Sequence, residues 1–307
     1  MRPLKNSSEI AIIGGGLAGL SAACHAARLG RAVTLFEGSG LYGGLVATTN
    51  EVDGLPMPGV FSGMDLAMHL LETARKAAVQ VVETSVSSIA PGERVTLTDA
   101  ENRAYHPEAI IIASGASLRR LEIPGEAEFE GRGISRCATC DGGFYRGKDV
   151  VVVGGGDGAV HEALVLAKTS RLVIMVCRSP SRAKREYLDK LAARENVEFI
   201  WDHEVSAVVG SDEVAGVRLR NVKDGAVSER ACAGVFPFIG VTPNTEFVPP
   251  GWRTASGHIA TNADYATADP RVFAVGAVRA NSGGNAVQAM AEGVGAAEAA
   301  ARRLAVF

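Results

Sequence analysis

The chain has 307 residues, of which 47% are hydrophobic and 21% charged, and its formal net charge is −3. A chain of this length and composition is expected to form about two globular domains. The small negative charge argues against nucleic acid or an anionic membrane as the main partner. No stretch approaches the roughly 18 apolar residues of a membrane span, and the polar start predicts no signal peptide. Five cysteines without the spacing of a secreted framework indicate a reducing cytoplasm.

The first part of the chain predicts a strand, a helix and a second strand in close succession. Residues 9–13 and 32–36 are short apolar runs, and the alanine-rich residues 17–29 between them are expected to be helical. A βαβ unit of this length is what a dinucleotide-binding fold requires. The next segments are expected to be an irregular loop over 38–62, a helix over 64–78, strands near 80–89 and 94–98, and an apolar run over 109–113.

From about residue 120 the same pattern starts again. The chain is expected to be α/β, with two Rossmann-like nucleotide-binding domains, the second inserted into the first. The first domain covers 1–116 and 242–307, and the inserted domain covers 117–241. The predicted elements are strands at 150–153 and 172–176, helices at 159–168 and 183–194, strands near 197–201, 204–209 and 214–220, a return segment at 234–240, a last strand at 272–275 and a helix over 286–304.

Gly14, Gly16 and Gly19 fit the pattern G-x-G-x-x-G between the first strand and the first helix. The first glycine permits a tight turn, the second lets a pyrophosphate approach the backbone, and the third allows close helix packing. Glu37 ends the next strand, where a carboxylate can bind the hydroxyl pair of a ribose. The pattern predicts an adenine dinucleotide site, and the alternative is a simple turn with a surface glutamate.

Gly154, Gly156 and Ala159 form a second turn of this kind, G-x-G-x-x-A, after a predicted strand. The strand that follows ends without a carboxylate, so the sequence does not favour recognition of the NAD ribose. Arg178 and Arg182, with further basic residues just beyond, suit the 2′-phosphate of NADP instead. The alternative is that these residues are solvated helix charges.

Cys137 and Cys140 are spaced C-x-x-C, a pair that readily cycles between dithiol and disulfide. Half of a zinc site is the alternative, but the sequence has no second C-x-x-C or histidine pair to complete it, so no metal is expected. Asp141 follows directly and either shuttles protons for a thiolate or caps the turn. The remaining cysteines are expected to be small core residues, namely Cys24, Cys177 and Cys232.

Together these motifs resemble the low-molecular-weight thioredoxin reductases, the class II pyridine nucleotide–disulfide oxidoreductases. The resemblance runs from about residue 9 to about residue 300. The stretches that carry it are Cys-Ala-Thr-Cys-Asp-Gly at 137–142, Val-Val-Val-Gly-Gly-Gly-Asp at 151–157, Ile-Ile-Ala-Ser-Gly at 111–115 and Gly-Val-Phe-Pro-Phe-Ile-Gly-Val-Thr-Pro-Asn-Thr at 234–245.

The resemblance implies FAD in the discontinuous domain and NADPH in the inserted one. It also implies that Cys140 faces the flavin, that Cys137 exchanges with the sulfur of a substrate, and that Asp141 acts as acid and base. A homodimer is implied in the same way. By the same resemblance, further FAD contacts are expected at Gly44, Gly115, Gly276, Asn285 and Ala286.

Several positions depart from the family pattern and mark the chain as a divergent member. Gly-Ala at 276–277 stands where the family usually has Gly-Asp, and Gly-Asn-Ala at 284–286 stands for Arg-Gln-Ala near the flavin ring. Gly-Gly-Leu at 43–45 replaces Gly-Gly-Gln. The NADPH signature His-Arg-Arg-x-x-x-Arg is reduced to Cys-Arg-Ser at 177–179, with Arg182 one residue early. We therefore expect FAD to be held by backbone and pyrophosphate contacts, and NADPH to be recognised weakly.

The predicted function is FAD-dependent thiol–disulfide exchange through Cys137 and Cys140, in which NADPH drives the reduction of a disulfide in a thioredoxin-like protein or a small molecule. The alternative is the reverse direction, an NADPH-independent dithiol oxidase that closes a disulfide in a secondary metabolite and passes the electrons to dioxygen. A flavin-binding protein without turnover is a third interpretation, and the intact cysteine pair with Asp141 argues against it. The enzyme is expected to be cytoplasmic.

Overall fold

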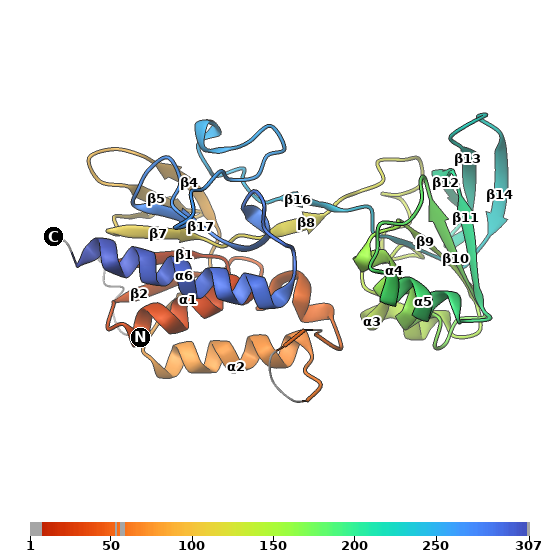
Figure 1. The fold of residues 1–307 in the computed structure, drawn as a ribbon. Helices are drawn as coiled ribbons and strands as arrows, with labels where there is room; N and C mark the ends of the chain where they lie inside the picture. The colour runs from red at the N-terminus through yellow and green to blue at the C-terminus, as the bar shows by residue number, and fades with distance from the viewer. Residues whose placement is uncertain (1–7, 53, 56–58, 306–307) are drawn as a thin grey trace. The chain divides into compact units, whose positions relative to one another are not determined.

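The structure, a computed structural model, describes residues 8–52, 54–55 and 59–305, which form two compact units (Figure 1). Unit 1 contains the described residues up to Ser117 and those from Pro243 onward, and unit 2 contains Leu118–Thr242. The chain passes between the units twice, through β8 (Ala116–Leu118) and β16 (Val241–Pro243). These two segments pair as a two-stranded sheet.

Unit 1 is built on a five-stranded parallel sheet in the order β17-β7-β1-β2-β3. Every residue of the central strands β7, β1 and β2 is buried. Such continuous apolar runs are typical of a parallel sheet, because layers cover both of its faces. The strands are β1 (Ile10–Ile13), β2 (Val33–Phe36), β3 (Gln80–Val82), β7 (Ala109–Ile112) and β17 (Val272–Ala274).

Different layers cover the two faces of this sheet (Figure 1). Ile10 and Ile12 pack into a core with the helices, whereas Ala11 and Ile13 pack on the opposite face, where an antiparallel sheet lies. The alternation follows from the two-residue repeat of a strand. The helices are α1 (Leu17–Arg28), α2 (Gly63–Lys76) and α6 (Ala286–Leu304), the antiparallel strands are β4 (Val86–Ala90), β5 (Thr96–Asp99) and β6 (Ala104–Tyr105), and the 3₁₀ turns are η1 (Gly44–Thr48), η3 (Pro250–Trp252) and η4 (Gly276–Val278).

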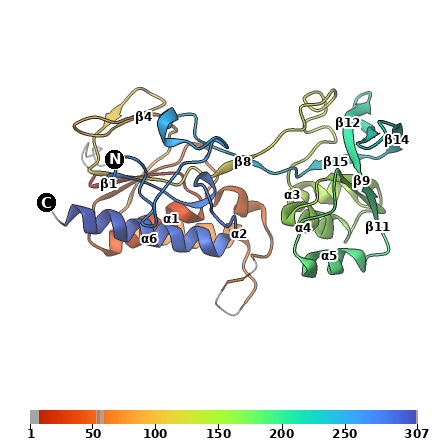
Figure 2. The same ribbon diagram turned by 45° about the horizontal axis from the view of Figure 1, so that its top comes forward.

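Unit 2 repeats this three-layer plan (Figure 2). Its parallel sheet has the order β11-β10-β9-β15, with helices on one face and an antiparallel three-stranded sheet on the other. The parallel strands are β9 (Asp149–Val153), β10 (Leu172–Cys177), β11 (Val197–Trp201) and β15 (Gly234–Pro237). The helical segments are α3 (Ala138–Asp141), η2 (Gly142–Tyr145), α4 (Asp157–Leu166) and α5 (Arg185–Ala192), and the antiparallel strands are β12 (His203–Gly210), β13 (Val214–Asn221) and β14 (Val227–Ala231).

The predicted α/β fold with two Rossmann-like domains is confirmed, and the structure differs from the prediction in detail. The strand predicted near 80–89 is two strands in different sheets, β3 and β4. The strands predicted at 204–209 and 214–220 belong to the antiparallel sheet, not to the nucleotide-type sheet. In β13 buried residues are interspersed with exposed ones, as in a sheet with one solvated face, whereas five of the six residues of β10 are buried.

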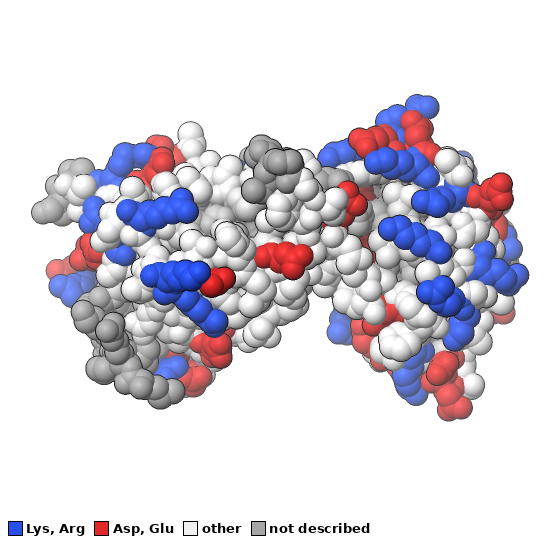
Figure 3. Space-filling view, turned by 90° about the horizontal axis from the view of Figure 1, so that it is seen from below, with Lys and Arg blue, Asp and Glu red and all other residues white. Residues whose placement is uncertain are grey.

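None of the helices within the described residues is long and apolar enough to cross a membrane. On the face drawn in Figure 3, lysines and arginines are interspersed with aspartates and glutamates over both units. That distribution agrees with the small net charge of −3.

Candidate active site

The first glycine-rich turn joins β1 to α1 in unit 1. Gly14 has φ +105°, and a Cβ there would lie 2.4 Å from the carbonyl oxygen of Ala113. A Cβ on Gly19 would lie 1.9 Å from the carbonyl oxygen of Gly14, so both positions require glycine. A Cβ on Gly16 would meet only the carbonyl oxygen of Gly43, at 4.0 Å. The start of α1 is therefore open at Gly16, where a helix N-terminus can bind a pyrophosphate.

Glu37 follows β2 and is only 9% exposed. Its Oε2 accepts a hydrogen bond from the backbone nitrogen of Gly15 at 2.6 Å. Its Oε1 accepts two more, each of 2.6 Å, from the backbone nitrogen and the hydroxyl of Ser39. The carboxylate is thus fixed beside the glycine turn, as expected for a residue that binds the ribose of a dinucleotide. The turn and this carboxylate together fit the adenosine diphosphate part of FAD.

Three more glycines predicted as FAD contacts lie at the same edge of the parallel sheet. Gly115 follows β7 with φ +66°, and Gly276 follows β17 with φ +72°. Gly44 has φ +60°, and a Cβ on it would lie 3.7 Å from the Cα of Gly16. Ligands of open α/β sheets bind outside the carboxyl ends of the strands, which is where these glycines are found. Their contact with FAD stays a prediction.

Asn285 and Ala286 lie at the start of α6. The side-chain oxygen of Asn285 accepts a hydrogen bond from the backbone nitrogen of Gln288 at 2.8 Å, so Asn285 caps this helix. Its amide nitrogen has no partner among the residues that the structure describes. A contact between this nitrogen and the flavin stays a prediction.

A buried ion pair that no sequence motif predicts lies at this edge, between Glu292 and Arg279. Glu292 is 2% exposed, and its carboxylate accepts hydrogen bonds from the backbone nitrogen of Gly276 at 2.7 Å and from the guanidinium of Arg279 at 2.5 Å. The pair fixes the loop that contains Ala277, where the family resemblance expects an aspartate. A glutamate among the small, buried residues of α6 was the only signal available in the sequence.

Cys137 and Cys140 form a disulfide in unit 2, with their Cα atoms 5.3 Å apart. Cys137 precedes α3, and its Sγ accepts a hydrogen bond from the backbone nitrogen of Cys140 at 3.0 Å. Cys137 is half-buried and Cys140 is exposed. A backbone N–H directed at a sulfur favours the thiolate, which is the nucleophilic form. This environment suits Cys137 as the attacking thiol.

Asp141 is the last residue of α3 and is half-buried. It provides no side-chain hydrogen bond to the turn η2 that follows, so the alternative of a capping role is wrong. Burial is the main cause that raises the pKa of Tyr145, and the negative charge of Asp141 is the second cause. A role of Asp141 in proton transfer stays a prediction.

The other three cysteines, Cys24, Cys177 and Cys232, are buried and free, as the sequence predicted. Burial raises the pKa of the Cys24 thiol, raises that of Cys177 to about 11 and raises that of Cys232 to about 12. A thiol that stays protonated is a poor nucleophile. These residues therefore do not compete with Cys137 and Cys140.

The second glycine-rich turn joins β9 to α4. A Cβ on Gly154 would lie 2.2 Å from the carbonyl oxygen of Phe238, so this position requires glycine. A Cβ on Gly156, the residue before α4, would have no atom within 4 Å. Ala159 is 1% exposed and packs in the core beneath the turn. The turn therefore has an open helix N-terminus like that at Gly16.

Arg178 and Arg182 lie in the loop between β10 and α5. Both are exposed, and neither guanidinium has a partner among the described residues. The backbone nitrogen of Arg182 donates to the carbonyl oxygen of Gly155 at 2.8 Å, which fastens this loop to the glycine turn. Both residues precede α5, which begins at Arg185, so they are solvated charges of a loop and not of a helix. Their contact with NADP stays a prediction.

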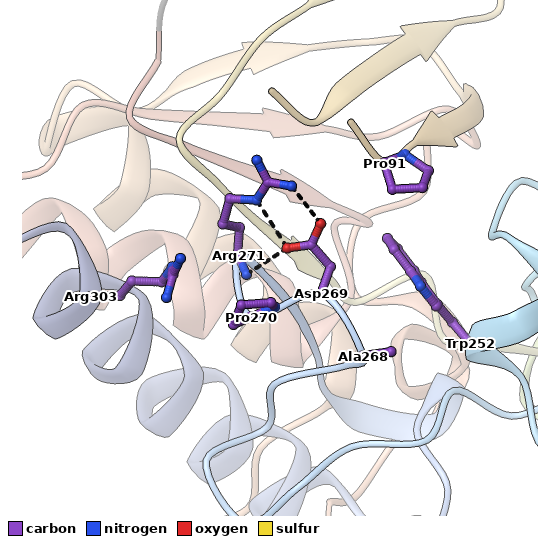
Figure 4. A pocket seen from close by; sticks show the side chains of 7 residues that line it. All are labelled: Pro91, Trp252, Ala268, Asp269, Pro270, Arg271 and Arg303. Atoms are coloured by element: carbon purple, nitrogen blue, oxygen red, sulfur yellow. Dashed lines mark hydrogen bonds and ion pairs between the residues drawn. The ribbon is translucent and has the colours of Figure 1, made fainter. Parts of the chain in front are cut away.

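A hollow of about 460 Å³ in unit 1 lies apart from these motifs (Figure 4). Asp269 and Arg271 form an ion pair along its wall, and they immediately precede β17. The hollow is therefore at the amino end of β17, whereas Gly276 is at its carboxyl end, where nucleotides bind. Within the described residues, no cluster of three His, Cys, Asp or Glu side chains is placed to hold a metal ion. The lining residues are Pro91, Trp252, Ala268, Asp269, Pro270, Arg271 and Arg303.

Comparison with known proteins identifies the family. The sequence profile described as pyridine nucleotide-disulphide oxidoreductase matches residues 8–293. The chain belongs to this family. It is 35% identical to the thioredoxin reductase of Treponema pallidum over 300 residues, which cover 97% of each chain. It is 36% identical over 307 residues to the bifunctional thioredoxin reductase/thioredoxin of Mycobacterium leprae, covering 97% of this chain and 66% of that protein. The crystal structure of Lactococcus lactis thioredoxin reductase superposes with a TM-score of 0.93 at 34% identity, covering 98% of this chain and 100% of that one.

These matches confirm the resemblance to the low-molecular-weight thioredoxin reductases and the prediction of an enzyme. Pyridine nucleotide-disulphide oxidoreductases of this type use FAD and NADPH, so the chain is a flavin-dependent thiol–disulfide oxidoreductase. When bound, FAD supplies the transfer of electron pairs between a nicotinamide and a disulfide. The open turn at Gly16 and the carboxylate of Glu37 are the groups that would hold it.

Proposed function

We propose that NADPH is the electron source of this enzyme and that the Cys137–Cys140 dithiol reduces a disulfide of a thioredoxin-like protein or a small molecule. The observation that carries the proposal is the redox pair itself, in which the Cys140 N–H points to the Cys137 sulfur. Opening the enzyme disulfide takes up two electrons and two protons. Cys137 then attacks one substrate sulfur and forms a mixed disulfide, and Cys140 displaces the substrate thiol and restores the enzyme disulfide.

We assign Asp141 to proton transfer in this exchange. It lies one residue after Cys140, is half-buried, and its carboxylate has no hydrogen bond within the described part of the chain. Each departing substrate sulfur needs a proton, and each attacking thiol has to lose one. A carboxyl group beside the pair can serve both steps.

We place the partner contact at Phe144, four residues beyond Cys140. Its side chain is 76% exposed, the highest fraction among the exposed large hydrophobic side chains of the described residues. An exposed aromatic beside a reactive sulfur offers apolar contact to the group that carries the substrate disulfide. The name of the Mycobacterium leprae relative, which joins a thioredoxin reductase and a thioredoxin, favours a thioredoxin-like partner.

We place NADPH at the second glycine turn. Gly154, Gly156 and Ala159 would receive its pyrophosphate at the start of α4, and Arg178 and Arg182 would meet its 2′-phosphate. The two guanidiniums are unpaired within the described residues and so can bind a phosphate without breaking an ion pair.

The second candidate is the dithiol oxidase that closes a disulfide in a small molecule. The altered NADPH signature favours it, because Cys177 and Ser179 supply no positive charge where the family signature has a histidine and an arginine. In this direction a substrate dithiol opens the Cys137–Cys140 disulfide, and two electrons leave through the cofactor to dioxygen. The same cysteines serve both directions.

We also propose that the enzyme is a cytoplasmic homodimer. An apolar surface on α2 of unit 1 supports the dimer: Met64 and Met68 are one helical turn apart on this helix, and both are exposed. A second copy of the chain would cover this surface. Leu41, Leu45 and Val60 are further exposed apolar side chains of unit 1.

Anaerobic mixing of the holoenzyme with NADPH, and separately with dithiothreitol, tests the direction. The reductase predicts that NADPH bleaches the flavin absorbance and that a subsequently added thioredoxin disulfide restores it. Slow or absent bleaching by NADPH, with rapid bleaching by dithiothreitol and recovery in air, would establish the oxidase instead. A protein that stays colourless with added FAD would contradict both.

A further inference from the structure

α4 presents a buried carboxylate to the redox motif. Glu162 is 8% exposed, and its Oε2 accepts a hydrogen bond from the backbone nitrogen of Ala138 at 2.7 Å. Ala138 directly follows Cys137 and is 1% exposed, so this bond is shielded from water. No motif in the sequence pointed to Glu162. It is therefore an acidic side chain in contact with the C-x-x-C backbone that the proposed exchange does not use.

The positive charges nearby leave Glu162 largely uncompensated. Arg136 precedes the motif, but its guanidinium pairs with Glu126 at 3.0 Å and with Glu130 at 2.9 Å. No lysine or arginine among the described residues pairs with Glu162. The nearest cationic candidate is His161, whose Nδ1 lies 3.9 Å from its Oε1.

The remaining ionisable groups on the elements packed against α3 are acidic. Asp141 is its last residue, Tyr145 ends the turn η2 that follows, and Asp157 begins α4. None of them offsets the charge of Glu162. His161 is the one group on these elements that would offset this charge when protonated.

We propose that Glu162 is a positioning residue that holds Ala138 in place and, through its charge, lowers the reduction potential of the Cys137–Cys140 pair. The inference rests on the proposed function, because it requires that the pair cycles between disulfide and dithiol. The disulfide carries no charge, and its reduction consumes two electrons and two protons, or one proton when Cys137 remains a thiolate. A fixed negative charge disfavours that thiolate and so favours the disulfide over the reduced state.

The effect of Glu162 on the Cys137 thiolate is opposite to that of the hydrogen bond from the Cys140 backbone. The N–H of Cys140 stabilises a negative Cys137 sulfur, whereas the carboxylate beside Ala138 destabilises it. A dithiol that is harder to form is a stronger reductant towards its substrate. The charge of Glu162 therefore favours the reductase direction over the dithiol oxidase.

Glu162→Gln tests the charge, since the amide oxygen can still accept the hydrogen bond from Ala138. The holoenzyme is equilibrated at about pH 8 in anaerobic glutathione buffers, then quenched with acid and alkylated, and the dithiol fraction of Cys137 and Cys140 is counted by mass spectrometry. We expect the equilibrium to shift towards the dithiol by about tenfold, which corresponds to about 30 mV. The matched control is Glu195→Gln, which removes an exposed carboxylate from the same unit and should leave the equilibrium unchanged.

A second readout is the pH dependence of Cys137 alkylation in the reduced enzyme, whose midpoint should fall in Glu162→Gln. If Glu162→Gln keeps the FAD content and melting temperature of the wild type yet shows neither shift, the role of Glu162 is refuted and the proposed function stands. If the wild-type pair does not open at all with excess NADPH or dithiothreitol, the proposed function fails, and the inference with it. Should Glu162→Gln fold poorly, Glu162→Asp, which keeps the charge, must retain the wild-type equilibrium.

Discussion

Gly15 donates a backbone hydrogen bond of 2.6 Å to Oε2 of Glu37, 22 residues further along the chain. The bond joins the glycine turn after β1 to the end of the neighbouring strand β2. It therefore fixes a carboxylate beside the open helix N-terminus at Gly16, where both the ribose and the pyrophosphate of a dinucleotide can be bound.

We predict that Glu37→Gln weakens FAD binding. An amide in this place loses the charge-assisted hydrogen bonds of the carboxylate, each of which contributes about 1.5–3 kcal/mol. The dissociation constant of FAD should rise by roughly ten- to a hundredfold. Fluorescence titration of the deflavinated protein measures it, and Glu108→Gln, at an exposed site in the same unit, is the control. Equal affinities in the two variants would show that Glu37 does not bind the cofactor.

Cys137→Ser and Cys140→Ser should each abolish reduction of a disulfide substrate, because exchange needs both an attacking and a resolving sulfur. Alanine at Cys24, Cys177 or Cys232 should leave turnover intact. Burial raises the pKa of Cys177 to about 11 and that of Cys232 to about 12, so iodoacetamide should not label these two thiols in the native enzyme at about pH 8. Mass spectrometry after labelling checks this, and full turnover in Cys140→Ser would refute the mechanism.

The fold and the cysteine pair could be predicted from the sequence because their signals are local. Glycines that no other residue can replace, such as Gly14 and Gly154, follow apolar strands at fixed spacing. The strand β14 was missed because all five of its residues are exposed, so no apolar alternation marks it. The helix α3 is too short to show any periodicity, although it positions the Cys137 sulfur.

Residues that act through tertiary contacts could not be found in this way. Glu162 meets Ala138 across 24 positions, and Glu292 meets Gly276 across 16, so only the folded chain brings them together. Asn285 shows the opposite case: its position suggested a flavin contact, and the structure adds a capping role that competes for its side-chain oxygen.

Arg178→Ala and Arg182→Ala should weaken NADPH binding and leave NADH binding nearly unchanged. Each guanidinium is free to meet the 2′-phosphate, and loss of one charge-assisted contact costs about 1.5–3 kcal/mol, or roughly ten- to a hundredfold in affinity. Steady-state KM values for both nucleotides measure it. Arg185→Ala, whose side chain pairs with Asp189, provides the control. An equal rise in KM for NADPH and NADH would show that the 2′-phosphate binds elsewhere.

Glu292→Gln should destabilise unit 1 by about 3 kcal/mol, because it leaves the charge of Arg279 without its buried partner. The melting temperature should fall by roughly 5–10 °C. Differential scanning fluorimetry compares this variant with Glu298→Gln, an exposed position on the same helix. Equal melting temperatures would show that the pair does not stabilise the loop after β17.

The most direct test of the redox pair is an electron count. The holoenzyme is titrated anaerobically with NADPH until the flavin absorbance stops changing. Each NADPH delivers two electrons, so the wild type should take up two equivalents per chain, one for FAD and one for the Cys137–Cys140 disulfide. The double variant Cys137→Ser/Cys140→Ser should take up one. Equal uptake by the two proteins, or no flavin reduction at saturating NADPH, would contradict the account.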